Sequence, residues 1–113
     1  MKKEIKWLIK KTLKKLGLYS EEASQLIFRT GMAESKYKHL RQINGPALGF
    51  FQIEPDTARD IWENYVAYRP LIKTHLWSLG FEESNLEYCM MSNIGLQIAF
   101  CRLHYRRIPT KLP

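Results

Sequence analysis

The chain has 113 residues, of which 45% are hydrophobic and 26% are charged. A chain of this length and composition excludes a disordered protein, so residues 1–113 are expected to form one domain around a single core. Eighteen lysines and arginines against eleven aspartates and glutamates give a net charge of +7. This excess favours anionic partners such as nucleic acid, anionic lipid or an anionic cell-wall polymer.

The N-terminal segment is basic. Its longest uncharged run, Trp7-Leu8-Ile9, is too short for a signal peptide, and no stretch has the ~20 apolar residues of a membrane span, so we expect a chain made without a signal peptide. Residues 4–16 place apolar side chains at helical spacing between lysines, and Gly17 follows where a helix should end. We expect a surface helix with one stripe on the core. Because Trp7 lies off this stripe, a membrane-surface helix is the alternative.

A second helix is predicted to begin after Ser20, a favourable N-cap, and to end at Glu34. Ala23, Ile27, Thr30 and Glu34 are spaced by four, three and four positions, so all four are expected on the side of the helix that faces the core. Burial on this side disfavours a charged carboxylate, so the sequence predicts that Glu34 stays protonated near neutral pH and donates a proton. The alternative is a surface glutamate paired with a basic neighbour, namely Arg29, Lys36 or Arg41.

The next segment is rich in turn-forming residues. Asn44-Gly45-Pro46 is a turn cluster, and Gly49 precedes the short alternating run Phe50-Phe51-Gln52-Ile53, which we expect to be extended. A small irregular or β-like insertion is therefore expected near residues 36–53. Pro55 then begins a helix whose apolar face carries Ala58, Ile61, Trp62 and Tyr65.

Two further helices are predicted in the C-terminal half. A short one covers residues 70–80. Ser84 and Glu87 have the spacing of a capping box at the start of the longest helix, Asn85 to about Arg106. Because this helix is apolar on more than one side, we expect it to be the buried central helix. The predicted fold is mainly α, with about five helices around this central helix and the small irregular or β-like insertion near residues 36–53.

Cysteine and histidine usage argues against other kinds of site. Cys89 and Cys101 would lie about 18 Å apart along one helix, too far for a disulfide, so both are expected to be buried thiols. The three histidines lack ligand spacing, so no metal or other cofactor is expected. A thiol enzyme based on Cys101 and His104 is disfavoured because that pair would be buried. Pro109 and Pro113 are expected to end the ordered chain.

Two sequence blocks resemble those of the lysozyme-like lytic transglycosylases. The first is Glu34-Ser35 at a helix end. The second is Gly49-Phe50-Phe51-Gln52-Ile53-Glu54-Pro55-Asp56-Thr57-Ala58, where that family has Gly-Leu-Met-Gln-Ile, an apolar residue, Pro, any residue and Thr-Ala. Asn93-Ile94-Gly95, opening an apolar helix, is a weaker third match. The resemblance covers roughly residues 18–105 and is greatest to bacteriophage members of the superfamily.

The resemblance implies an α+β lysozyme-like fold. It also implies a peptidoglycan-cleaving enzyme that acts on the β-1,4 bond between N-acetylmuramic acid and N-acetylglucosamine. Glu34 would be its general acid and base. Ser35 would help to orient the glutamate or the substrate. The other residues expected to bind the substrate are Gly49, Phe51, Gln52 and Tyr65. The family's late tyrosine has no clear counterpart here, and Tyr88 and Tyr105 are candidates for it.

One carboxyl group suffices in the family's reaction. The substrate's own N-acetyl oxygen stabilises the oxocarbenium-like centre, and the same glutamate then takes the proton of the sugar's 6-hydroxyl as an anhydro ring closes. A hydrolytic muramidase with two carboxylates is the alternative, the second coming from Glu54, Asp56, Asp60 or Glu63.

The implied partners are peptidoglycan glycan strands, reached by a monomer at the bacterial cell wall, either virion-associated or released to the periplasm. The basic N-terminal helix could also hold anionic cell-wall polymers or a membrane surface. A non-catalytic virion protein that binds the wall or nucleic acid is the alternative from another class.

Overall fold

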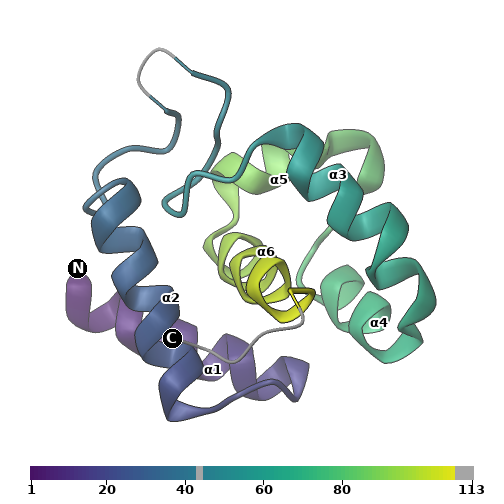
Figure 1. The fold of residues 1–113 in the computed structure, drawn as a ribbon, viewed down its shortest axis with the longest axis horizontal. Helices are drawn as coiled ribbons and strands as arrows, with labels where there is room; N and C mark the ends of the chain where they lie inside the picture. The colour runs from purple at the N-terminus through teal and green to yellow at the C-terminus, as the bar shows by residue number, and fades with distance from the viewer. Residues whose placement is uncertain (43–44, 109–113) are drawn as a thin grey trace.

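The computed structural model describes residues 1–42 and 45–108. These residues form six α-helices and two 3-10 helices: α1 (Lys2–Leu16), α2 (Glu21–Glu34), α3 (Pro55–Asn64), η1 (Val66–Tyr68), α4 (Pro70–Ser78), η2 (Glu83–Asn85), α5 (Leu86–Ser92) and α6 (Ile94–Arg106). Figure 1 shows α6 at the centre, with the other helices around it. Every residue from Leu96 to Leu103 is buried. The fold is mainly helical around a buried central helix, as predicted.

Helix α1 buries its apolar stripe in the core. Ile5, Ile9 and Leu13 are inaccessible to solvent, and the helix packs on both α6 and α2. Gly17 ends it in the left-handed conformation, at φ 71°. Because the core already covers this stripe, α1 cannot use it to enter a lipid surface, although Trp7 is 60% exposed. In the part of the chain that the structure describes, no helix combines the length and apolarity that crossing a membrane requires.

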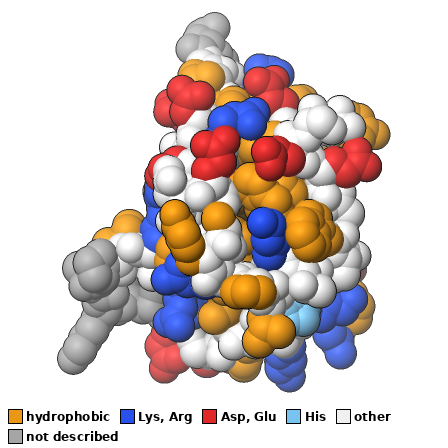
Figure 2. Space-filling view, turned by 90° about the vertical axis from the view of Figure 1, so that its right-hand side faces the viewer, with side chains coloured by type: hydrophobic (Ala, Val, Ile, Leu, Met, Phe, Trp, Pro, Cys, Tyr) orange, Lys and Arg blue, Asp and Glu red, His pale blue; other side chains and the backbone are white. Residues whose placement is uncertain are grey.

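Charge is unevenly distributed over the molecule. Helix α1 carries seven lysines and one glutamate. Most acidic residues lie instead on or near α3, η2 and α5, as Asp56, Asp60, Glu63, Glu82, Glu83 and Glu87. Figure 2 shows acidic side chains gathered in the upper part of the face that carries α3, above a hydrophobic area. The net positive charge is therefore concentrated at the α1 side of the fold.

The run from residue 50 to residue 53 is not extended, and that prediction was wrong. Leu48 and Ile53 exchange two backbone hydrogen bonds, of 2.8 and 3.0 Å, and so close residues 49–52 into a tight turn. Gly49 and Gln52 turn the chain with φ values of 78° and 52°. Pairing between residues 41 and 53 is limited to isolated bridges among the described residues. The insertion is therefore irregular rather than a sheet.

The predicted long helix is two helices, which explains why there are more than five. Asn93 interrupts it with extended backbone, at φ −116° and ψ 102°. Its side-chain oxygen accepts the N–H of Leu96 at 2.9 Å, and its amide nitrogen donates to the Leu79 carbonyl at 2.8 Å. Asn93 thus caps α6 and fixes the end of α5. The spacing of apolar residues does not indicate this interruption.

Smaller boundary predictions had mixed outcomes. The capping box is not formed, because residues 83–85 make a 3-10 helix and α5 begins after Asn85 without a side-chain cap. Cys89 and Cys101 are buried free thiols, as predicted, but they lie on different helices. The expectations that concern Asn44, Pro109 and Pro113 fall outside the described residues.

Candidate active site

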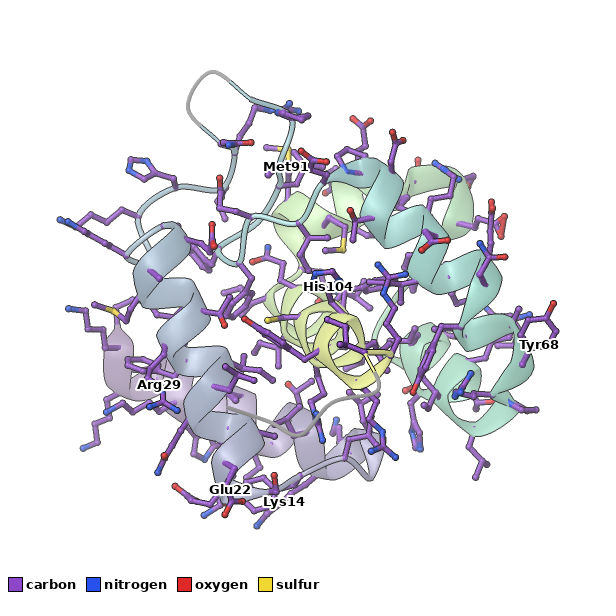
Figure 3. All side chains as sticks on the ribbon, viewed as in Figure 1. Lys14, Glu22, Arg29, Tyr68, Met91 and His104 are labelled. Atoms are coloured by element: carbon purple, nitrogen blue, oxygen red, sulfur yellow. The ribbon has the colours of Figure 1, made fainter. Side chains whose placement is uncertain are left out.

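A cleft of about 320 Å³ lies between the end of α2, the 49–52 turn with the start of α3, and the C-terminal half of α6. Its walls include Thr30, Glu34, Gln42, Phe51, Gln52, Glu54, Cys101, His104 and Tyr105. Figure 3 shows the side chains that project from these elements, with His104 labelled on α6. The cleft brings together residues from both sequence blocks described above.

Glu34 is the last residue of α2 and borders the cleft. Its side chain is exposed rather than buried, so the prediction of a carboxylate in a partly dry site was wrong for the free protein. The helical stripe continues to Glu34, but α2 ends there and no other element among the described residues covers its side chain. Within residues 1–42 and 45–108 the carboxylate forms no ion pair, so the expected alternative of pairing with a basic neighbour is not formed.

A hydroxyl pair joins the two walls of the cleft. Thr30, one helical turn before Glu34, donates its hydroxyl proton to the Leu26 carbonyl at 2.8 Å and lies 2.9 Å from the Tyr105 hydroxyl. Because a threonine hydroxyl has one proton, the tyrosine is the donor in this pair. Of the two tyrosine candidates, the structure brings Tyr105 into the cleft. Tyr88 lies on α5, is 72% exposed and does not border the cleft.

Ser35 lies behind the cleft and is not among the residues that border it. It is only 3% exposed. Its hydroxyl donates to the Phe50 carbonyl at 2.6 Å and accepts the Tyr37 N–H at 3.0 Å. These bonds tie the end of α2 to the turn that carries Phe51 and Gln52. Because Ser35 directly follows Glu34, these bonds fix the position of the 49–52 turn relative to the end of α2 that carries the carboxylate.

The same turn is anchored on α6 by Gln97, a residue that the sequence analysis did not single out. Gln97 is fully buried, accepts the Phe50 N–H at 3.0 Å and donates to the Met91 carbonyl at 3.1 Å. Gly49 packs against this side chain and against the Met90 carbonyl. It lies behind the cleft instead of lining it. A lone amide inside the apolar run of α6 was the available signal for Gln97.

The remaining predicted contact residues divide into two groups. Phe51 and Gln52 both border the cleft, but Phe51 is only 3% exposed and mainly packs in the core beneath it. The Gln52 amide nitrogen donates to the Gly49 carbonyl at 2.8 Å, which leaves its amide oxygen as an acceptor for a ligand. Tyr65, in contrast, does not border the cleft. It follows α3, and the Arg69 guanidinium lies over its ring, 3.6 Å from the ring centre.

Among the four candidates for a second carboxylate, only Glu54 borders the cleft. Asp60 instead accepts hydrogen bonds from Asn64 and Arg107. These bonds, with that of Asn64 the stronger influence, lower the pKa of the Asp60 carboxyl. Asp60 is therefore part of a surface pair between α3 and the residue that follows α6.

The α6 wall offers little nucleophilic or metal chemistry. Burial raises the pKa of the Cys101 thiol, which keeps it protonated. Burial, and secondly the nearby Arg107 charge, lowers the pKa of His104, which favours its neutral form. Across the described residues, no group of three or more histidine, cysteine, aspartate and glutamate side chains is placed to hold a metal ion.

Comparison with models of known protein families, with curated proteins and with solved structures finds no match to this chain. The cleft is where the two sequence blocks meet. The structure brings Glu34, Phe51 and Gln52 together, and it places Ser35 and Gly49 behind them as supports.

Proposed function

We propose that this protein cleaves the β-1,4 bond between N-acetylmuramic acid and N-acetylglucosamine in peptidoglycan, as a lytic transglycosylase with Glu34 as its single catalytic carboxylate. The observation that carries the proposal is the position of Glu34, an accessible carboxylate at the edge of the cleft into which Tyr105 projects. From the second sequence block, Gln52 supplies an amide oxygen at the same cleft, and the nearly buried Phe51 supports its wall.

The reaction needs one proton donor that later becomes a base. In the first step Glu34 protonates the glycosidic oxygen as its bond to C1 breaks, and the N-acetyl oxygen of the muramic residue bonds to C1. In the second step the Glu34 carboxylate removes the proton of the 6-hydroxyl, whose oxygen displaces the N-acetyl oxygen at C1. The product carries a 1,6-anhydro ring, no water is consumed, and Glu34 regains its proton.

The exposure of Glu34 in the free protein is compatible with this role. A long, stiff glycan strand needs an open binding site, and a bound strand excludes water from the carboxylate. The bound strand would then leave the acid in contact with the sugar instead of with solvent. The burial expected from the sequence is thus proposed for the complex rather than for the free enzyme.

Hydrolysis is the second candidate, because Glu54 borders the same cleft. In that reaction Glu34 again protonates the leaving oxygen, while Glu54 activates a water molecule or attacks C1 directly. The sugar bond that breaks is the same, but the new end is a free reducing sugar.

The proposed function predicts that the purified protein clears a suspension of purified peptidoglycan. The optical density should fall at an initial rate proportional to protein concentration, and heat-denatured protein should have no effect. A known muramidase serves as the control that the suspension can be cleared. If that control clears the suspension and micromolar amounts of this protein do not, the proposed activity is wrong.

A further inference from the structure

A second concave surface lies between α1 and α2, outside the cleft. This α1–α2 groove has a volume of about 480 Å³. The side chains that define it are Lys6, Lys10, Tyr19, Glu21, Phe28 and Arg29. The mechanism proposed above uses none of them.

The groove is cationic. Lys6, Lys10 and Arg29 are exposed, and none of them forms an ion pair with an acidic side chain in the part of the chain that the structure covers. Glu21 is the one carboxylate in the lining, and it already accepts the Tyr19 hydroxyl at 2.7 Å. Three cationic side chains and one carboxylate therefore line the groove, and the resulting net positive charge fits an anionic ligand.

The aromatic rings of the groove are already covered by other groups. The Lys6 ammonium lies 4.8 Å from the centre of the Phe28 ring, and the same ring stacks on Tyr37 at 5.4 Å. The Lys14 ammonium lies 5.3 Å from the centre of the Tyr19 ring. Single-stranded nucleic acid is usually bound by rings on which its bases stack. In this groove ammonium groups lie over the rings on which bases would stack. The groove therefore favours a phosphate polymer that has no bases.

The groove and the cleft use different sides of α2. At about 100° per residue, Phe28 and Arg29 lie roughly 160° and 100° around the helix from Thr30. Figure 3 shows Arg29 on the α1 side of α2, while His104 is on α6, across from the other side of that helix. A polymer in the groove therefore leaves the cleft open to a glycan strand.

We propose that the α1–α2 groove binds a linear polyol phosphate, an anionic phosphodiester polymer of the kind found in bacterial cell walls. The net positive charge of the groove, its position between α1 and α2 and the coverage of its rings by other groups carry this assignment. The proposal rests on the proposed function for its biological setting, because it gives a wall-cleaving enzyme a second attachment to the wall. An insertion into lipid is not available to α1, whose apolar stripe lies in the core.

The test is a titration of the full-length protein with poly(glycerol phosphate), which measures binding without any cleavage. The groove variant is Lys6→Gln/Lys10→Gln/Arg29→Gln. The matched control is Lys2→Gln/Lys11→Gln/Lys15→Gln, which removes the same charge from exposed positions outside the groove. The groove variant is expected to weaken binding by about tenfold or more, and the control by less than about threefold. Wild-type affinity should also fall with added salt.

Three results would overturn the proposal. The first is that the wild type does not bind poly(glycerol phosphate) at low salt. The second is that the groove variant and the control variant lose the same amount of affinity. The third is that the wild type binds a single-stranded oligonucleotide, or phosphatidylglycerol vesicles, more tightly than poly(glycerol phosphate) with the same number of phosphates. Activity separates this proposal from the proposed function. On walls stripped of phosphate polymers the groove variant should clear peptidoglycan as fast as the wild type, and on intact walls more slowly. A wild type that binds the polymer but clears no wall would refute the activity alone.

Discussion

Replacing Glu34 with glutamine is expected to lower the rate of peptidoglycan clearing by about 10²–10⁴-fold, because the amide has no acidic proton to give to the leaving oxygen. The side chain is exposed and forms no ion pair within the described residues, so the fold should be unaffected. Its free energy of unfolding should stay within about 0.5 kcal/mol of the wild type. Initial clearing rates on one suspension, with urea denaturation of the same samples, measure both effects.

The matched control is Glu54→Gln, which changes the other carboxylate at the cleft. If one carboxylate performs both proton transfers, this variant should lose less than about tenfold in rate. Comparable losses in the two variants would instead support hydrolysis with two carboxylates. A Glu34→Gln protein that clears the suspension at the wild-type rate would remove Glu34 from the mechanism.

Gly49→Ala is expected to destabilise the protein strongly, lowering the free energy of unfolding by about 2–4 kcal/mol. Two causes act together. Gly49 has a φ of 78°, a conformation that strains any residue with a Cβ. That Cβ would also lie 2.7 Å from the Met90 carbonyl oxygen and 2.9 Å from the Gln97 side chain. Because one of these atoms is backbone and the other is held by hydrogen bonds, neither can move freely.

Gly17→Ala separates the two causes. Gly17 has a similar φ of 71°, but a Cβ there meets no atom within 4 Å. Its substitution should therefore show the backbone strain alone, about 1–2 kcal/mol. Urea denaturation of both variants gives the comparison, provided that the slope with denaturant is unchanged. A Gly49→Ala protein no less stable than Gly17→Ala would mean that the turn does not need its close approach to α6.

Most of the helical framework could be predicted from local sequence signals. Ser20 begins α2, Pro55 begins α3 and Gly17 ends α1, each where its side chain or its conformational freedom predicts. The interruption at Asn93 could not be predicted in this way, because apolar residues continue at helical spacing on both sides of it. The interruption depends on the hydrogen bond that the Asn93 side chain donates to the Leu79 carbonyl, fourteen residues away in the sequence.

The site was less predictable, because its geometry depends on contacts between distant residues. The 49–52 segment alternates like a strand, yet hydrogen bonds from Ser35 and Gln97 hold it in a turn. Tyr105 reaches the cleft by pairing with Thr30, which is 75 residues away. The error about Glu34 has a different cause. A helical stripe predicts which side a residue faces, but not whether another element covers the end of the helix.

The central claim is that one carboxyl group breaks the glycan bond without the addition of water. Mass spectrometry of the fragments released by the wild-type protein in water enriched in ¹⁸O tests it most directly. If Glu34 acts as the single catalytic carboxylate of a lytic transglycosylase, the fragments should end in 1,6-anhydro-N-acetylmuramic acid and carry no ¹⁸O. Fragments with reducing ends that contain ¹⁸O would contradict it.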